Sequence, residues 1–391
     1  MSSSTDPIAR QSVSLPGGSC DMRVSAGALE RLGRDLRIIV GRPRKAVLVV
    51  GDDVDADLVR DVERNLTDGR FFVHVLEVPH GRTCRRVDAM PDLYASLDGF
   101  GVTSEDALVA MGDVDVCSCA AYLATTWCGG MPFALVPLTL DAVVECVATP
   151  HPLDVGESTE MVSVVCRAQM LVCDLDLVPL EVSPETLRAR AIMVASAVAG
   201  SPDAFSSLAG DADAILSGDV AAIQRQLLTC GKTRGRLISA TSLAVRQGVG
   251  YGVTFERALA SCLPADAVAA AGPGRLLAEG IRFASRLAVG VGEGDVDMVF
   301  AQDALLDKLG LAEVPCSIEP GIVLAAIKEA GLKRTNRYLF ALPLAVGRVR
   351  LTAVPDEVMD EHLGAWCASR SRLATAADKD EHSTDDEGED L

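Results

Sequence analysis

The chain has 391 residues, which is too long for one ordinary hydrophobic core and predicts two domains. Hydrophobic residues make up 49% and charged residues 23%, a composition typical of globular proteins and not of disordered or fibrous ones. The formal net charge of −19 argues against a nucleic-acid partner and against binding to an anionic membrane surface, because both need clustered Lys and Arg.

The sequence shows neither a transmembrane helix pattern nor a signal-peptide pattern. No run of 18 or more uninterrupted apolar residues is present, so we expect no transmembrane helix. The first residues are polar and lack an apolar stretch of signal-peptide length, which predicts a cytoplasmic protein. Because that compartment is reducing, we expect the twelve cysteines to be small buried side chains and not disulfides. The sequence contains no Cys-x-x-Cys pair, so a zinc–thiolate site is not indicated.

The first half of the chain alternates short apolar runs with helical stretches. Buried strands are predicted at 45–53, 71–79, 107–113, 132–139 and 170–176, with helices at 56–66 and 117–126. Strands separated by helices predict a parallel α/β sheet, in which ligands bind at the carboxyl ends of the strands. Those ends include Gly51–Asp53, Gly112–Asp113 and Pro137–Thr139.

From about Pro179 the pattern becomes mainly helical. Apolar residues recur at the helical period over 184–200, 218–238, 274–292 and 320–331, and 337–351 predicts two short strands joined near Pro343–Gly347. Residues 378–391 carry eight acidic side chains and one Lys, which is typical of a solvated tail. The predicted parts are a Rossmann-like α/β domain (1–178), a mainly helical domain with a small hairpin (179–368) and an acidic disordered tail (369–391). The cleft between the two domains is the expected ligand site.

The turn after the third predicted strand has the position, but not the glycines, of a dinucleotide-binding turn. Gly112 is its one glycine, and Asp113 and Asp115 would repel a diphosphate. An ordinary strand-to-helix turn, capped by Asp113 or Asp115, is therefore favoured over a nucleotide cradle.

Few residues are placed for catalysis. His80 and His151 lie in predicted loops after strands, where each is either a general acid–base group or an ordinary loop histidine. Nucleophile elbows and P-loops are absent, so no catalytic residue is assigned. A set of cationic side chains lies in the second half of the chain, and they would form an anion site if they converged. On this observation alone, solvent-exposed helix faces paired with nearby acids explain them better. The set is Arg190, Lys232, Arg234, Arg236, Arg246, Arg257, Lys333, Arg334 and Arg337.

Several segments, in the same order along nearly the whole chain, resemble the dehydroquinate synthase family. Val47–Leu66 resembles its first strand–helix unit, Val78–Leu97 its glycine-bearing loop, and Ala107–Leu140 its cofactor turn, helix and strand end. Gln169–Ile192 resembles the start of the family's helical domain. Tyr251–Leu259 resembles the segment that normally reads Gly-His-Thr-x-x-His, and Arg337–Leu351 resembles a late hairpin.

The resemblance implies a Rossmann-like N-terminal domain and a helical C-terminal domain, commonly in a homodimer. It also implies NAD and a divalent metal, usually zinc. Members oxidise a sugar phosphate transiently, eliminate phosphate and close a carbocycle. The founding activity uses a seven-carbon sugar acid phosphate of the shikimate pathway, and sister enzymes make other cyclitol precursors.

Most of the family's functional positions are altered in this chain. The resemblance places the metal-binding Glu at Arg190 and the two metal-binding His at Val253 and about Pro273. None of these side chains donates an electron pair to zinc, so no metal site is predicted. Four other functional residues of the family are replaced here. Arg257 stands where the family has a further active-site His, and Ser118 stands where it has the Asp after the glycine turn. The Lys of the family's Gly-Gly-Lys segment falls near His151, and a substrate-binding Arg falls near Gly129.

The residues that remain as candidates fall into two sets. The resemblance leaves Asp52, Arg85, Gly112 and Thr139 for the cofactor, and Arg190, Arg234, Arg246, Arg257 and His151 for a substrate or another anion. We expect a pseudoenzyme without NAD or zinc that binds a small anionic ligand, or acts as a scaffold or regulator, as a homodimer or a partner of another enzyme. The alternative is a working carbocyclase or lyase of the shikimate or a cyclitol pathway with a rearranged active site.

Overall fold

The computed structural model describes residues 9–42, 44–148, 150–165, 167–335 and 339–386, which form two compact units. The first unit comprises residues 1–189 and 217–240, and the second comprises 190–216 and 241–391. This division differs from the predicted boundary at residue 178, because helix α8 (Val220–Ile238) packs on the hairpin of the first unit. Gly235 allows the approach, since a Cβ there would lie 2.5 Å from a methyl carbon of Val13.

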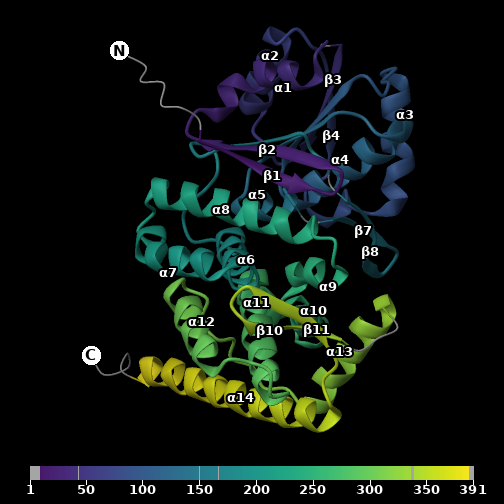
Figure 1. Cartoon of the computed structure of the whole chain (residues 1–391). Helices are drawn as coiled ribbons and strands as arrows, with labels where there is room; N and C mark the ends of the chain where they lie inside the picture. The colour runs from purple at the N-terminus through teal and green to yellow at the C-terminus, as the bar shows by residue number, and fades with distance from the viewer. Residues whose placement is uncertain (1–8, 43, 149, 166, 336–338, 387–391) are drawn as a thin grey trace. The chain divides into compact units, whose positions relative to one another are not determined.

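The first unit is built on a seven-stranded sheet (Figure 1). Its strands, in spatial order, are β1 (Ala9–Leu15), β2 (Gly18–Ser25), β9 (Met170–Asp174), β6 (Phe133–Pro137), β5 (Ala107–Gly112), β3 (Lys45–Gly51) and β4 (Phe72–Val78). β1 and β2 are antiparallel, and all other neighbours are parallel. The five predicted strands and the parallel α/β class are therefore confirmed, whereas the β1–β2 hairpin was not predicted.

Helices cover this sheet and supply its core. They are α1 (Leu32–Val40), α2 (Ala56–Asp68), α3 (Met90–Gly99), α4 (Val114–Thr126) and α5 (Leu140–Cys146). Leu36 of α1 and Leu66 of α2 pack with Leu48 and Val109 of the sheet in one buried cluster. The apolar runs of β3 and β5 are buried because helices lie against a parallel sheet. This core holds the carboxyl ends of the central strands in a fixed arrangement.

A second hairpin lies beside α4 in the first unit. Strands β7 (His151–Val155) and β8 (Ser158–Val164) pair antiparallel and pack against that helix. His151 was predicted to lie in a loop, which was wrong, because it begins strand β7. The alternating exposure of β8 leaves no continuous apolar run, so the hairpin gives a weak signal in the sequence.

The second unit is mainly helical, as predicted. Its elements are the end of α6 (Pro184–Gly200), α7 (Pro202–Leu216), α9 (Leu243–Arg246), α10 (Val253–Cys262), α11 (Ala265–Gly290), α12 (Val296–Lys308), α13 (Pro320–Thr335) and α14 (Asp356–Asp386), with β10 (Phe340–Ala345) and β11 (Arg348–Thr352). The β10–β11 hairpin confirms the predicted late hairpin. Stacked rings of Phe255 and Phe283, with centroids 3.9 Å apart, join α10 to α11.

The predicted acidic tail begins inside a helix. Trp366, Cys367 and Arg370 of α14 are buried, and α14 continues to Asp386, so the structure differs from the disordered tail expected from residue 369 onward. Packing of these side chains in the second unit stabilises the helix before the acidic run begins. Residues 387–391 lie outside the described residues, as does Arg337. In the described part of the chain no helix is long and apolar enough to cross a membrane.

Candidate functional site

Three of the four predicted cofactor residues lie at one edge of the first unit's sheet. Asp52 directly follows β3, Gly112 ends β5, and Thr139 follows β6. These strands are neighbours in the sheet, in the order β6-β5-β3, so their carboxyl ends meet at the same edge. In an open parallel sheet this is the edge at which ligands bind. The fourth residue, Arg85, follows β4, the next strand along.

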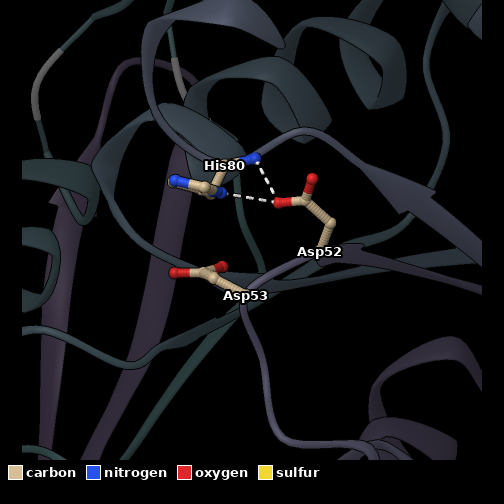
Figure 2. Close-up of side chains that lie close together, drawn as sticks. All are labelled: Asp52, Asp53 and His80. Carbon is tan, nitrogen blue, oxygen red and sulfur yellow. Dashed lines mark hydrogen bonds and ion pairs between the residues drawn. The ribbon is translucent and has the colours of Figure 1, made fainter.

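Asp52, Asp53 and His80 form a small cluster at this edge (Figure 2). Both the backbone N–H of His80 and its Nδ1 lie within hydrogen-bond distance of Asp52 Oδ1, at 2.8 and 2.7 Å. This bond raises the pKa of His80 above 6.5 and lowers the pKa of Asp52 below 3.8. Sequence reasoning considered Asp52 and His80 separately, because the bond joins loops that follow two different strands.

Asp52, Asp53 and His80 are also the one group among the described residues whose donor atoms could surround a metal ion. One donor atom from each residue lies within 4.8 Å of the others, and all three side chains are exposed. Carboxylate and imidazole donors suit several divalent metals. The ion pair of His80 with Asp52, however, already explains the arrangement as a link between two loops.

The N-terminus of α4 is capped by the protein's own carboxylate. Asp113 Oδ1 accepts a hydrogen bond from the backbone N–H of Val116 at 2.8 Å, and Oδ2 accepts one from Gly81 N–H at 3.3 Å. The predicted capped turn is therefore confirmed for Asp113. Gly112 is required for close packing, since a Cβ there would lie 2.9 Å from Val116 Cβ. The helix end that binds phosphate in dinucleotide folds thus carries a negative side chain.

Arg85 is enclosed by acidic side chains. It is 5% exposed and lies 2.9 Å from Asp115, 3.8 Å from Asp154 and 3.9 Å from Glu160. Burial raises the pKa of Asp115 to about 6, although the charge of Arg85 opposes that shift. Sequence reasoning missed Asp154 and Glu160 as partners because they belong to the unpredicted β7–β8 hairpin. The positive charge of Arg85 is therefore matched by carboxylates of this chain.

Thr139 and His151 are also engaged in local contacts. The Thr139 hydroxyl donates to Asp141 Oδ1 at 2.6 Å, and burial raises the pKa of Asp141 to about 7. His151 is 1% exposed, with Nδ1 at 3.4 Å from Ser118 Oγ. Burial lowers the pKa of His151 to about 4, so the ring is neutral at pH 7. A neutral imidazole supplies no charge to an anion, which disfavours the predicted role of His151.

The other predicted anion-binding residues are divided between the two units. Arg234 is buried in α8 of the first unit. Arg190 in α6, Arg246 at the end of α9 and Arg257 in α10 belong to the second unit. Their convergence on one ligand stays a prediction.

The positions that the resemblance assigns to zinc do not fit a metal in this structure. Arg190 is a buried cation, 3% exposed, that donates through Nη1 to the carbonyl oxygen of Leu309 at 3.1 Å. Val253 begins α10, and Pro273 lies within α11 next to Gly272, whose φ of 68° breaks the helix. None of the three offers an electron pair to a metal.

Several 3-dehydroquinate synthases are similar to this chain in sequence. That of Pelobacter propionicus is 25% identical over 321 residues, which cover 79% of this chain and 86% of the relative. That of Desulforamulus reducens is 25% identical over 352 residues, covering 86% and 94%. That of Thermobifida fusca is 30% identical over 146 residues, covering 37% and 40%. No protein-family model matches the chain.

Solved structures share the fold at low sequence identity. A 2-deoxy-scyllo-inosose synthase complexed with carbaglucose-6-phosphate, NAD+ and Co2+ aligns with a TM-score of 0.78 and 15% identity, covering 91% of this chain and 99% of the other. The 2-epi-5-epi-valiolone synthase of Streptomyces hygroscopicus, with NAD+ and Zn2+ bound, gives a TM-score of 0.72 at 15% identity, covering 94% and 99%. The two-part fold implied by the resemblance is therefore confirmed.

Proposed function

We propose that this chain is a dehydroquinate synthase-like protein that has lost the NAD- and zinc-dependent cyclisation of a sugar phosphate. We propose instead a binding protein with a scaffolding or regulatory role. The observation that carries this proposal is the carboxylate of Asp113, which accepts the hydrogen bond of Val116 N–H at the start of α4. A pyrophosphate group cannot use that backbone donor while the carboxylate holds it.

The charge around this turn opposes a dinucleotide as well. Asp113 and Asp115 are separated by one residue, and the nearby guanidinium of Arg85 is paired with Asp115 at 2.9 Å. A diphosphate would add negative charge where three carboxylates already lie within 4 Å of Arg85 and a fourth, that of Asp113, caps α4. This arrangement supports the loss of NAD.

The loss of zinc has a separate support. The side chains of Arg190, Val253 and Pro273 have no atom that donates an electron pair to a metal. Arg190 also carries a fixed positive charge that would repel a divalent cation. Without a metal, the reaction lacks the Lewis acid that polarises substrate oxygens. The charge at the α4 turn and the residues at the zinc positions thus support the proposed loss by two independent routes.

The decisive experiment measures metal content, NAD binding and phosphate release on one preparation of the full chain. A 3-dehydroquinate synthase prepared in parallel is the positive control, with its sugar acid phosphate as substrate. We expect no stoichiometric zinc, no NAD binding at micromolar concentration and no phosphate release above background. Stoichiometric zinc with micromolar NAD binding and turnover would instead establish the alternative, a working carbocyclase with a rearranged active site. A homodimer or a complex with another enzyme also stays a proposal, which light scattering after size-exclusion chromatography checks.

A further inference from the structure

Buried arginines in this structure are normally paired with carboxylates. Four of those whose ion pairs are described have an acidic partner: Arg23 with Asp21 and Asp35, Arg85 with Asp115, Arg282 with Asp307, and Arg370 with Glu279 and Glu313. Arg190 differs from them, since no carboxylate of the described residues pairs with it although it is only 3% exposed. A buried cation without a counter-ion is unfavourable, so this exception calls for an explanation.

The hydrogen bonds of Arg190 leave one edge of its guanidinium group unused. Nη1 donates to the carbonyl oxygen of Leu309 at 3.1 Å. Nε has no hydrogen-bond partner, and no hydrogen bond within the described part of the chain involves Nη2. The Nε–Nη2 edge presents two parallel N–H groups, which is the arrangement that binds a carboxylate or phosphate bidentately.

A second buried cation holds the same loop in the second unit. Arg282 of α11 donates through Nη2 to the carbonyl oxygen of Leu311 at 2.8 Å, two residues after the Leu309 carbonyl that Arg190 uses. Arg282 also pairs with Asp307 at 2.6 Å, while its buried Nη1 has no hydrogen-bond partner among the residues that the structure describes. Two guanidinium groups thus hold the loop after α12 through its carbonyl oxygens, and of the two only Arg282 pairs with a carboxylate of the described residues.

We propose that Arg190 is the anchor of an oxyanion site that binds a phosphate or carboxylate group of a small molecule through Nε and Nη2. Arg282 adds positive potential beside the same loop. Burial lowers the pKa of Arg190, as expected for a charge that no carboxylate in the described part of the chain offsets. The inference rests on the proposed binding role and names the ligand class. It is independent of the loss of zinc and NAD, which metal analysis and NAD titration test separately.

The experiment titrates the full-length protein with inorganic phosphate and with acetate at constant ionic strength, using calorimetry and thermal melting. We expect the melting temperature to rise with ligand concentration, because a ligand that binds the folded state stabilises it. Arg190→Gln removes both charge and fork and should weaken binding at least about tenfold. Arg190→Lys keeps the charge but loses the fork, and should give an intermediate loss. Arg60→Gln, on the exposed face of α2, is the control for general ionic effects and should bind as the wild type does.

A second measurement distinguishes this site from a structural role of Arg190. Without ligand, Arg190→Gln should melt at the wild-type temperature or higher, since it removes an unpaired buried charge. Arg370→Gln should melt lower, because it leaves the buried Glu279 without its cation. A response to phosphate and not acetate, or the reverse, identifies the group that is bound. The proposal is overturned if neither ion shifts the wild type at millimolar concentration, if Arg190→Gln responds like the wild type, or if Arg190→Gln alone melts much lower.

Discussion

The carboxylate of Asp113 should act both as a helix cap and as a barrier to NAD, and two substitutions separate these roles. Asp113→Ser keeps an N-cap oxygen for the Val116 N–H but removes the charge, whereas Asp113→Ala removes both. We expect Asp113→Ser to unfold at about the wild-type temperature. Asp113→Ala should lose about 1 kcal/mol of unfolding free energy, since that is the typical value of an N-cap side chain. For a unit of this size the loss corresponds to a melting temperature lower by about 2–4 °C.

The barrier to NAD follows from Coulomb's law. Two unit negative charges about 4 Å apart repel by about 1 kcal/mol in bulk water and about 4 kcal/mol at an effective dielectric constant of 20. Removing the charge should therefore strengthen NAD binding by between about fivefold and about a thousandfold. Calorimetric titration of the wild type and both variants with NAD measures this gain, which should be of similar size for Ser and Ala. Micromolar binding by the wild type, unchanged in Asp113→Ser, would refute the reasoning.

Three further predictions concern ionisable groups. Because the pKa of His80 is raised and the pKa of Asp52 is lowered, their ion pair should stabilise the protein between about pH 4 and 6.5. This stabilisation should be lost as the pH rises through the folded-state pKa of His80. An NMR titration of the Asp52→Asn variant should show a lower pKa for His80. His151, with a pKa lowered to about 4, should make stability fall as the pH drops from 6.5 to 4, by roughly 3 kcal/mol, and urea unfolding of His151→Gln should show a flatter acid limb. Arg370→Met leaves Glu279 buried and unpaired, so urea unfolding should show a loss of about 3–5 kcal/mol, less in the double variant with Glu279→Gln.

Patterns that are local in the sequence were predictable, and contacts between distant segments were not. β3 and β5 are continuous apolar runs because helices cover them, and this pattern is visible without a structure. The Asp113 cap was predictable because the carboxylate reaches an amide three residues ahead. The partners of Arg85 were not predictable, since Asp154 and Glu160 come from a hairpin far along the chain whose alternating residues give a weak signal.

The assignment of α8 to the first unit shows a second limit of sequence reasoning. Its helical period was evident, but periodicity does not reveal which partner the apolar face meets. Gly231 and Gly235 determine the contact, because a Cβ on either would lie within 2.6 Å of a side chain of the β1–β2 hairpin. Because that hairpin was itself not predicted, the element that packs against these two glycines could not be identified from the sequence. The same difficulty applies to Arg190: that no carboxylate of the described residues pairs with it becomes visible only when the surrounding elements are in place.

The charges at two altered positions support the proposed loss of NAD and of zinc in opposite ways. Where the resemblance implies the negative phosphates of NAD, the start of α4 now carries the carboxylate of Asp113. Where it implies a zinc ion held by a carboxylate, α6 carries the cation Arg190. A buried cation that would repel zinc, and whose Nε has no hydrogen-bond partner among the described residues, fits the proposed exchange of a metal for an anion as the bound group.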